Sequence, residues 1–168
     1  MFLINDAVVY GSQGVCEIVD IAEKKIDGVA RPYFILKPKT DSNATFYVPA
    51  WNEKAWSKMR KVMTQQDINA LIDSMPNNTP VWITNDNERK ETYRKILASG
   101  NQADIIAMIQ ALFQHKKVRE AEGKRLHMSD EHFLKDAEQL LYNEWQYVLN
   151  VDKAGLMDYI FSRIENSR

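Results

Sequence analysis

The sequence predicts an α+β protein in which a small antiparallel β-unit precedes an all-α helical bundle. Through about Val62, short runs rich in Val, Ile, Tyr and Phe alternate with turn residues, a pattern typical of a small all-β unit. From Thr64 onward, the apolar residues recur at helical spacing instead. The chain has 168 residues, of which 45% are hydrophobic and 27% charged, and this composition is ordinary for a globular protein with a buried core.

The β-unit is predicted to form a small twisted antiparallel sheet or barrel. Its strands cover residues 7–10, 15–26, 31–37 and 44–49, with a closing strand around residues 59–63. The turn signal between the second and third strands is Asp27-Gly28, because this dipeptide tolerates the positive φ angles of a two-residue hairpin turn.

The helical part is predicted to begin at Thr64, which can cap a helix over residues 65–74. Two prolines and two asparagines then stop the helix at residues 75–80, which makes this stretch the best linker candidate. A helix capped by Asn85 or Asp86 ends at Ser99-Gly100. Three more helices are expected from residue 101, from the N-cap Ser129 and from about residue 153. The first of these carries an apolar stripe that is expected to face the core and consists of Ile105, Met108, Ile109, Leu112 and Phe113. The predicted domains are therefore residues 1–63, a helix and linker over 64–80, and a helical domain over 81–168.

No residue pattern indicates an enzyme. Gly11 and Gly14 are not followed by a helix that opens with Lys-Ser or Lys-Thr, so a phosphate cradle is not expected. The three histidines lack the spacing of metal ligands, and Cys16 is interpreted as a packed strand residue rather than a nucleophile. We therefore expect no catalytic residues, metal or cofactor. No membrane span or export signal is visible, which predicts a cytoplasmic location.

The charges are unevenly distributed along the chain. The formal net charge is -1, yet residues 89–125 contain nine basic and four acidic residues, whereas residues 126–168 contain four basic and eight acidic ones. A local basic stretch, rather than the total charge, is what binds phosphates, so these residues support a nucleic-acid partner. The alternative interpretation is an ordinary solvated helical face.

Tryptophan provides a second candidate contact. Trp82 precedes the basic helix, where it could pack back on the bundle or project as a wedge of the kind that inserts into a DNA minor groove. Trp51 and Trp56 follow the fourth predicted strand, where they could cover the base of the β-unit or contact a partner.

The order of several motifs resembles the CarD/CdnL family, bacterial transcription regulators that bind RNA polymerase. The motifs are Asp6-Ala7-Val8-Val9-Tyr10 with Gly14, Tyr33-Phe34-Ile35-Leu36-Lys37, Phe46-Tyr47-Val48-Pro49-Ala50, Leu97-Ala98-Ser99-Gly100-Asn101 and Met128-Ser129. The resemblance implies a Tudor-like N-terminal barrel that docks on the β-subunit lobe of the polymerase. It also implies a helical domain that contacts upstream promoter DNA and wedges a tryptophan into the minor groove, which stabilises the open complex.

The resemblance assigns site residues as follows. Lys24, Phe46, Tyr47 and Pro49 would face the polymerase. The residues that would face DNA are Trp82, Arg89, Lys90, Arg94, Lys116, Lys117 and Arg119. The family's wedge position falls on Asp86, four residues after Trp82. The partners expected are the polymerase β subunit and promoter DNA, with no membrane and no small-molecule substrate. The alternative function is a protein-only adaptor that binds the polymerase or another partner without contacting DNA.

Overall fold

The computed structural model describes residues 1–41 and 43–167, which divide into two compact units. The first unit spans Met1–Met63 and the second begins at Thr64. The first contains an antiparallel sheet of strands β1 (Ala7–Tyr10), β2 (Val15–Ile26), β3 (Val29–Pro38), β4 (Phe46–Pro49) and β5 (Met59–Lys61), with two short helices, η1 (Gly11–Gln13) and α1 (Glu53–Trp56). The second is helical: α2 (Gln65–Ser74), η2 (Met75–Asn77), α3 (Asp86–Ser99), α4 (Gln102–Ala121), α5 (Met128–Leu149) and α6 (Lys153–Asn166). The predicted α+β class is confirmed.

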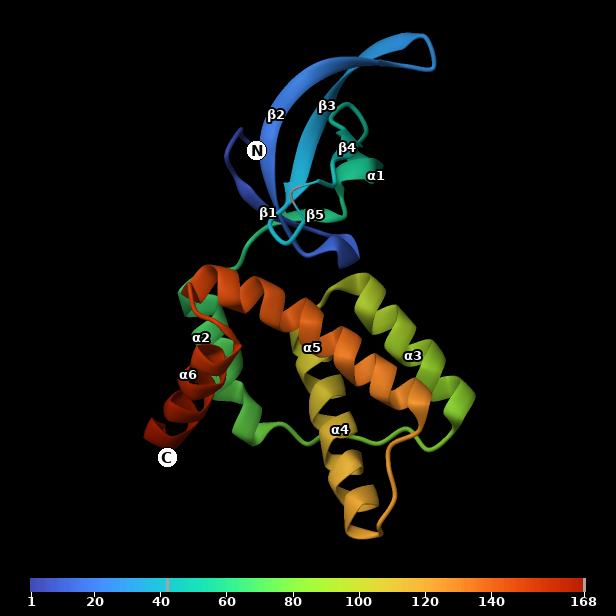
Figure 1. The fold of residues 1–168 in the computed structure, drawn as a ribbon, viewed down its shortest axis with the longest axis vertical. Helices are drawn as coiled ribbons and strands as arrows, with labels where there is room; N and C mark the ends of the chain where they lie inside the picture. Colours follow the sequence, from blue (N-terminus) through green and yellow to red (C-terminus); the bar gives the residue numbers. More distant parts are fainter. Residues whose placement is uncertain (42, 168) are drawn as a thin grey trace. The chain divides into compact units, whose positions relative to one another are not determined.

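The five strands are joined in the order β4-β3-β2-β1-β5. β2 and β3 form a long curved hairpin (Figure 1). Its turn is Asp27-Gly28, with φ angles of 52° and 79°, as the dipeptide predicts. Within the described residues no ladder joins β4 to β5, so the backbone pairing shows the antiparallel sheet but not its closure into a barrel.

The core of the first unit lies on one face of this sheet. Apolar side chains from all five strands meet there, and the N-terminal Phe2 closes the cluster by edge contacts with Phe34 and Trp56, at centroid distances of 5.9 and 6.0 Å. Trp56 therefore covers the sheet, which is one of the two alternatives considered for it. The buried members of the cluster are Val8, Cys16, Ile18, Phe34, Leu36, Val48 and Met59.

In the second unit the helices pack around a continuous apolar core. α4 packs against α5, and α6 packs against both α5 and α2. The largest fully buried side chain is Trp145 of α5. Because α2 packs against α6, the stretch predicted as a helix and linker contributes its helix to the bundle itself.

One helix start differs from the prediction. The sequence predicts Ser129 as the cap of the fifth helix, but α5 begins at Met128, and its N-cap His127 makes no capping bond through its side chain. Ser129 therefore lies inside the first turn. The short helix α1, capped by the side chain of Asn52, has no counterpart in the sequence prediction, because four residues are too few to show a period.

Candidate interaction surfaces

The sheet carries the residues predicted to contact the polymerase, and the strand register sorts them onto its two faces. Alternate residues of a strand point to opposite faces. Phe46 points to the core side, where its ring lies 5.9 Å from that of Tyr10. Tyr47 points the other way and is 49% exposed. The two predicted contacts therefore lie on opposite faces of the sheet. Phe46 packs against the core and does not present its ring to a partner.

Lys24 and Pro49 share the face of Tyr47. The register pairs Tyr47 with Ile35 and Lys24 with Arg31. Ile35 and Arg31 are four positions apart on β3, so they point to the same face, and directly opposed residues share a face as well. Pro49 lies two positions after Tyr47 on β4. We call Lys24, Arg31, Tyr47 and Pro49 the Tyr47 face.

An exposed tryptophan that the sequence left unassigned extends this surface. The guanidinium of Arg31 lies over the ring of Trp51, 4.2 Å from its centroid. Trp51 is 47% exposed and follows β4 directly. The sequence alone could not place Trp51 and Arg31 on the same surface as Lys24. That placement follows from the β2–β3 register, which pairs Arg31 with Lys24, and from the contact of Arg31 with Trp51.

Arg89 occupies the centre of the helical unit rather than its surface. It is 2% exposed, and its Nε and Nη2 donate to the two carboxylate oxygens of Asp130 at 2.9 and 3.0 Å. Nη2 also donates to Asp86 at 2.8 Å, and Nη1 donates to the carbonyl of Ile83 at 2.9 Å. This geometry neutralises and encloses the guanidinium, so Arg89 connects α3 to α5 and is not available to a phosphate. Its prediction as a DNA contact does not agree with this burial.

Trp82 packs back on the bundle, the first of the two alternatives for this residue. Its ring stacks on His115 of α4 with a centroid distance of 3.7 Å, and the guanidinium of Arg89 lies 4.5 Å from its centroid. Burial lowers the pKa of His115; nearby Asp130 opposes this shift, whereas the positive charges of Arg119 and Arg89 reinforce it. Trp82, Arg89, His115 and Asp130 form what we call the Trp82 cluster.

The other predicted DNA contacts lie on two helices. Lys90 and Arg94 are one turn apart on α3, and Lys116, Lys117 and Arg119 lie near the end of α4. Arg119 is partly engaged, because its Nε donates to the carbonyl of Arg125 at 2.6 Å. The Nζ of Lys117 lies 4.9 Å from the ring centroid of Phe113, an exposed aromatic that the helical spacing predicts in the core stripe.

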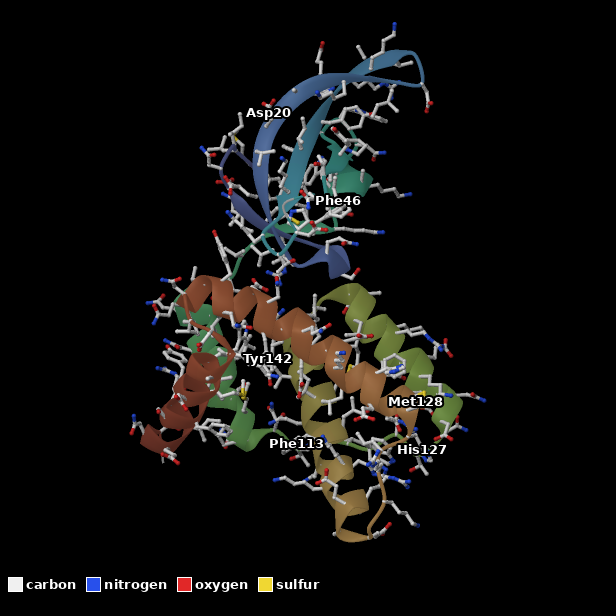
Figure 2. All side chains as sticks on the ribbon, viewed as in Figure 1. Asp20, Phe46, Phe113, His127, Met128 and Tyr142 are labelled. Carbon is white, nitrogen blue, oxygen red and sulfur yellow. The ribbon has the colours of Figure 1, made fainter. Side chains whose placement is uncertain are left out.

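Phe113 and the Trp82 cluster lie on different sides of α4. Phe113 and His115 are two positions apart, and residues at that spacing do not share a helix face. In the view of Figure 2, Phe113 and His127 accordingly lie on opposite sides of this helix. The apolar stripe predicted over residues 105–113 therefore ends one residue early, at Leu112, which is buried.

Two open hollows are present in the helical unit. The larger, about 600 Å³, lies between α2 and α6. Its arginine, Arg163, is engaged by Asp73 through two hydrogen bonds of 2.8 Å. The smaller, about 190 Å³, is lined by Ser74, Asn78 and Thr79, which flank η2, and by Ala103, Ile106 and Ala107 of α4. Across residues 1–41 and 43–167, no group of three or more His, Cys, Asp or Glu is placed to hold a metal ion.

On the face opposite the core cluster, the β-unit exposes Tyr47 together with basic side chains. Residues 2–63, the N-terminal unit, match the family described as CarD-like/TRCF RID domain. This match confirms the resemblance to the CarD/CdnL family. Domains of this family bind RNA polymerase and are not enzymatic in general. No curated protein matches the chain. None of the described helices is long and apolar enough to cross a lipid bilayer.

Proposed function

We propose that this protein regulates transcription by binding the β-subunit lobe of RNA polymerase through its N-terminal unit and upstream promoter DNA through its helical unit. The observation that carries the proposal is the match of residues 2–63 to an RNA polymerase-interacting domain family. The bound protein stabilises the open complex. In this proposal the curved sheet acts as a Tudor-like barrel.

The Tyr47 face is the proposed polymerase contact. This face carries an exposed tyrosine, a lysine and an Arg–Trp pair, which offer rigid aromatic area together with positive charge, and tyrosine, tryptophan and arginine are enriched among interface hot spots. Lys24 and Arg31 are directly opposite one another and carry like charges, so an acidic surface on the partner would relieve their repulsion. Tyr47 and Lys24 are therefore the proposed anchor residues.

The proposed DNA contact excludes the buried arginine. Lys90, Arg94, Lys116, Lys117 and Arg119 supply the basic groups, and we assign Trp82 and Arg89 to holding the segment that precedes α3. Cationic side chains on a helical surface bind the phosphate backbone without reading the sequence. The contact therefore positions the helical unit on DNA of any sequence.

Stabilisation of the open complex follows from differential binding. A protein that binds melted promoter more tightly than closed promoter shifts the equilibrium by the difference in the two binding free energies. Tethering by the polymerase raises the local concentration of the helical unit at the DNA, so a weak DNA contact is sufficient. This agrees with a net charge of only -1 for the whole chain.

Binding of the full chain to RNA polymerase tests the first half of this proposal. Tyr47→Ala is expected to weaken binding at least tenfold, as truncation of an interface hot spot does. Tyr147→Ala is the matched control, because Tyr147 is a similarly exposed tyrosine on α5 of the helical unit. Equal binding by the wild type and the Tyr47 variant would remove the Tyr47 face from the interface, and no binding by the wild type would end the proposal.

Salt-dependent binding to promoter DNA separates this function from the protein-only adaptor. The wild type should lose affinity steeply as salt rises. Lys116→Ala with Lys117→Ala should reduce the slope by about one for each phosphate that the variant no longer neutralises. The matched control is Lys135→Ala with Lys153→Ala, which removes the same charge from the acidic C-terminal helices. If the wild type binds polymerase but no DNA at any salt concentration, the adaptor function is correct.

A further inference from the structure

We propose that Phe113 stacks on an unpaired DNA base, with Lys116 and Lys117 holding the adjoining phosphates. The inference rests on the proposed function and names the residue that distinguishes melted from duplex DNA. It assigns this role to a phenylalanine in the middle of α4 rather than to Trp82.

Phe113 is exposed in a part of α4 whose preceding residues pack inward. Its ring is 48% exposed, whereas Ala111 and Leu112 just before it are buried. A single exposed apolar side chain is common on protein surfaces and needs no explanation by itself. The charges next to the ring therefore have to indicate whether it binds a partner.

Positive charge surrounds this ring. Lys116 and Lys117 lie three and four positions after Phe113, the two spacings that place side chains next to each other on a helix. The ammonium of Lys117 lies 4.9 Å from the ring centroid. An aromatic face flanked by lysines matches the chemistry of single-stranded nucleic acid, in which bases stack on aromatic rings and phosphates pair with cations.

A second exposed phenylalanine of the helical unit has acidic rather than basic neighbours. Phe161 of α6 is 62% exposed. Its neighbours at helical spacing include Asp158, three positions before it, and Glu165, four positions after it. Two carboxylates beside the ring would repel a phosphate backbone, so Phe161 has the wrong charge for the same partner. Both phenylalanines are exposed, and they differ in the sign of the charges beside the ring.

Trp82 is less suited to this role because its ring is already occupied. It stacks on His115 at 3.7 Å, and the buried guanidinium of Arg89 lies over it as well. Insertion of Trp82 between bases would require these contacts to break. The ring of Phe113 is instead contacted by the exposed side chain of Lys117, which can move aside without disturbing the core. A duplex, in which each base already stacks on its neighbours, offers this ring no free surface. The DNA partner is therefore a single-stranded segment of a melted region.

The test compares two DNA probes with the full chain: a duplex, and a forked duplex of the same sequence that carries a single-stranded arm. The wild type should bind the fork more tightly. Phe113→Ala and Phe113→Leu should reduce fork affinity by about fivefold to 100-fold, the range found when a base-stacking aromatic is removed. Neither change should alter duplex affinity, because the charge is unchanged. The leucine variant keeps apolar bulk and fold while removing the ring.

Phe161→Ala is the matched control and should bind both probes as the wild type does. If both Phe113 variants bind the fork as tightly as the wild type, while Lys116→Ala with Lys117→Ala weakens both probes, the stacking role is wrong and the proposed DNA contact stands. If the wild type binds neither probe, both the stacking role and the DNA half of the proposed function are wrong.

Discussion

Arg89 shows how a charged residue in a basic stretch can be structural. From the sequence, all nine basic residues over 89–125 were counted as surface charges. Arg89, however, is buried and pairs with Asp130, 41 residues further along the chain. Nothing local in the sequence marks this pair, because Asp130 also fits the ordinary role of an acid in the first turn of a helix. Side-chain pairing over such a distance is determined by the packing of α3 against α5.

Removal of either partner should destabilise the helical unit. Asp130→Asn or Arg89→Met is expected to lower its unfolding free energy by about 3–5 kcal/mol, because the remaining charge would be buried without its partner. Urea unfolding followed by far-UV circular dichroism measures this. Lys95→Ala breaks the exposed Glu91–Lys95 pair of α3 and should cost less than about 1 kcal/mol. A similarly small change in the Asp130 variant would show that the buried pair does not hold α3 to α5.

His115 should make the stability of the helical unit depend on pH. Its pKa is lowered in the folded state, mainly by burial, so the unfolded chain binds more protons as the pH falls below about 6.5. The contribution of neutral His115 is complete above that pH and is lost as the pH falls through the folded-state pKa. His115→Phe keeps a ring against Trp82 and removes the titration.

The measurement is the urea midpoint at pH 7.5 and at pH 5. The wild type should lose more stability between these two conditions than His115→Phe does. His132→Gln, which changes an exposed histidine of α5, should behave as the wild type does. An identical pH dependence for the wild type and the His115 variant would contradict the assignment.

At the level of elements, periodicity and turn chemistry predicted the helices and strands, but not their faces. The runs around Phe34 and Val48 were recognised as strands, and Asp27-Gly28 as the turn between β2 and β3. The strand pattern could not tell which of Phe46 and Tyr47 points outward, because both are aromatic and the alternation is fixed only by register. Likewise, the apolar stripe on α4 was extended one residue too far, to Phe113.

Helix α4 depends on its cap as much as on its apolar stripe. The side chain of Asn101 accepts a hydrogen bond of 3.0 Å from the backbone N–H of Asp104. Asn101→Ala should therefore lower the unfolding free energy of the helical unit by about 1 kcal/mol. Gln114→Ala, an exposed change in the middle of the same helix, should stay within about 0.5 kcal/mol in the same urea titration. A cost equal to that of the control would mean that the cap contributes nothing.

At the scale of the whole molecule, an antiparallel sheet unit precedes a helical unit in which basic and acidic residues are segregated along the chain. Sequence motifs were sufficient for the β-unit, since the family match covers residues 2–63. They were not sufficient for the helical unit, where each candidate contact depends on which side of a helix a residue occupies. The excess of basic residues over 89–125 and the excess of acidic residues over 126–168 nearly cancel, so the total charge conceals the basic stretch.

The lifetime of the open promoter complex tests the central claim most directly. RNA polymerase is allowed to open a promoter fragment, a competitor is added, and the half-life of the complex is measured without protein, with the wild type and with Tyr47→Ala at one limiting concentration. We expect the wild type to lengthen the half-life severalfold and Tyr47→Ala to lose most of this effect, because the helical unit would no longer be held at the DNA. A wild-type protein that binds polymerase and leaves the half-life unchanged would contradict this account.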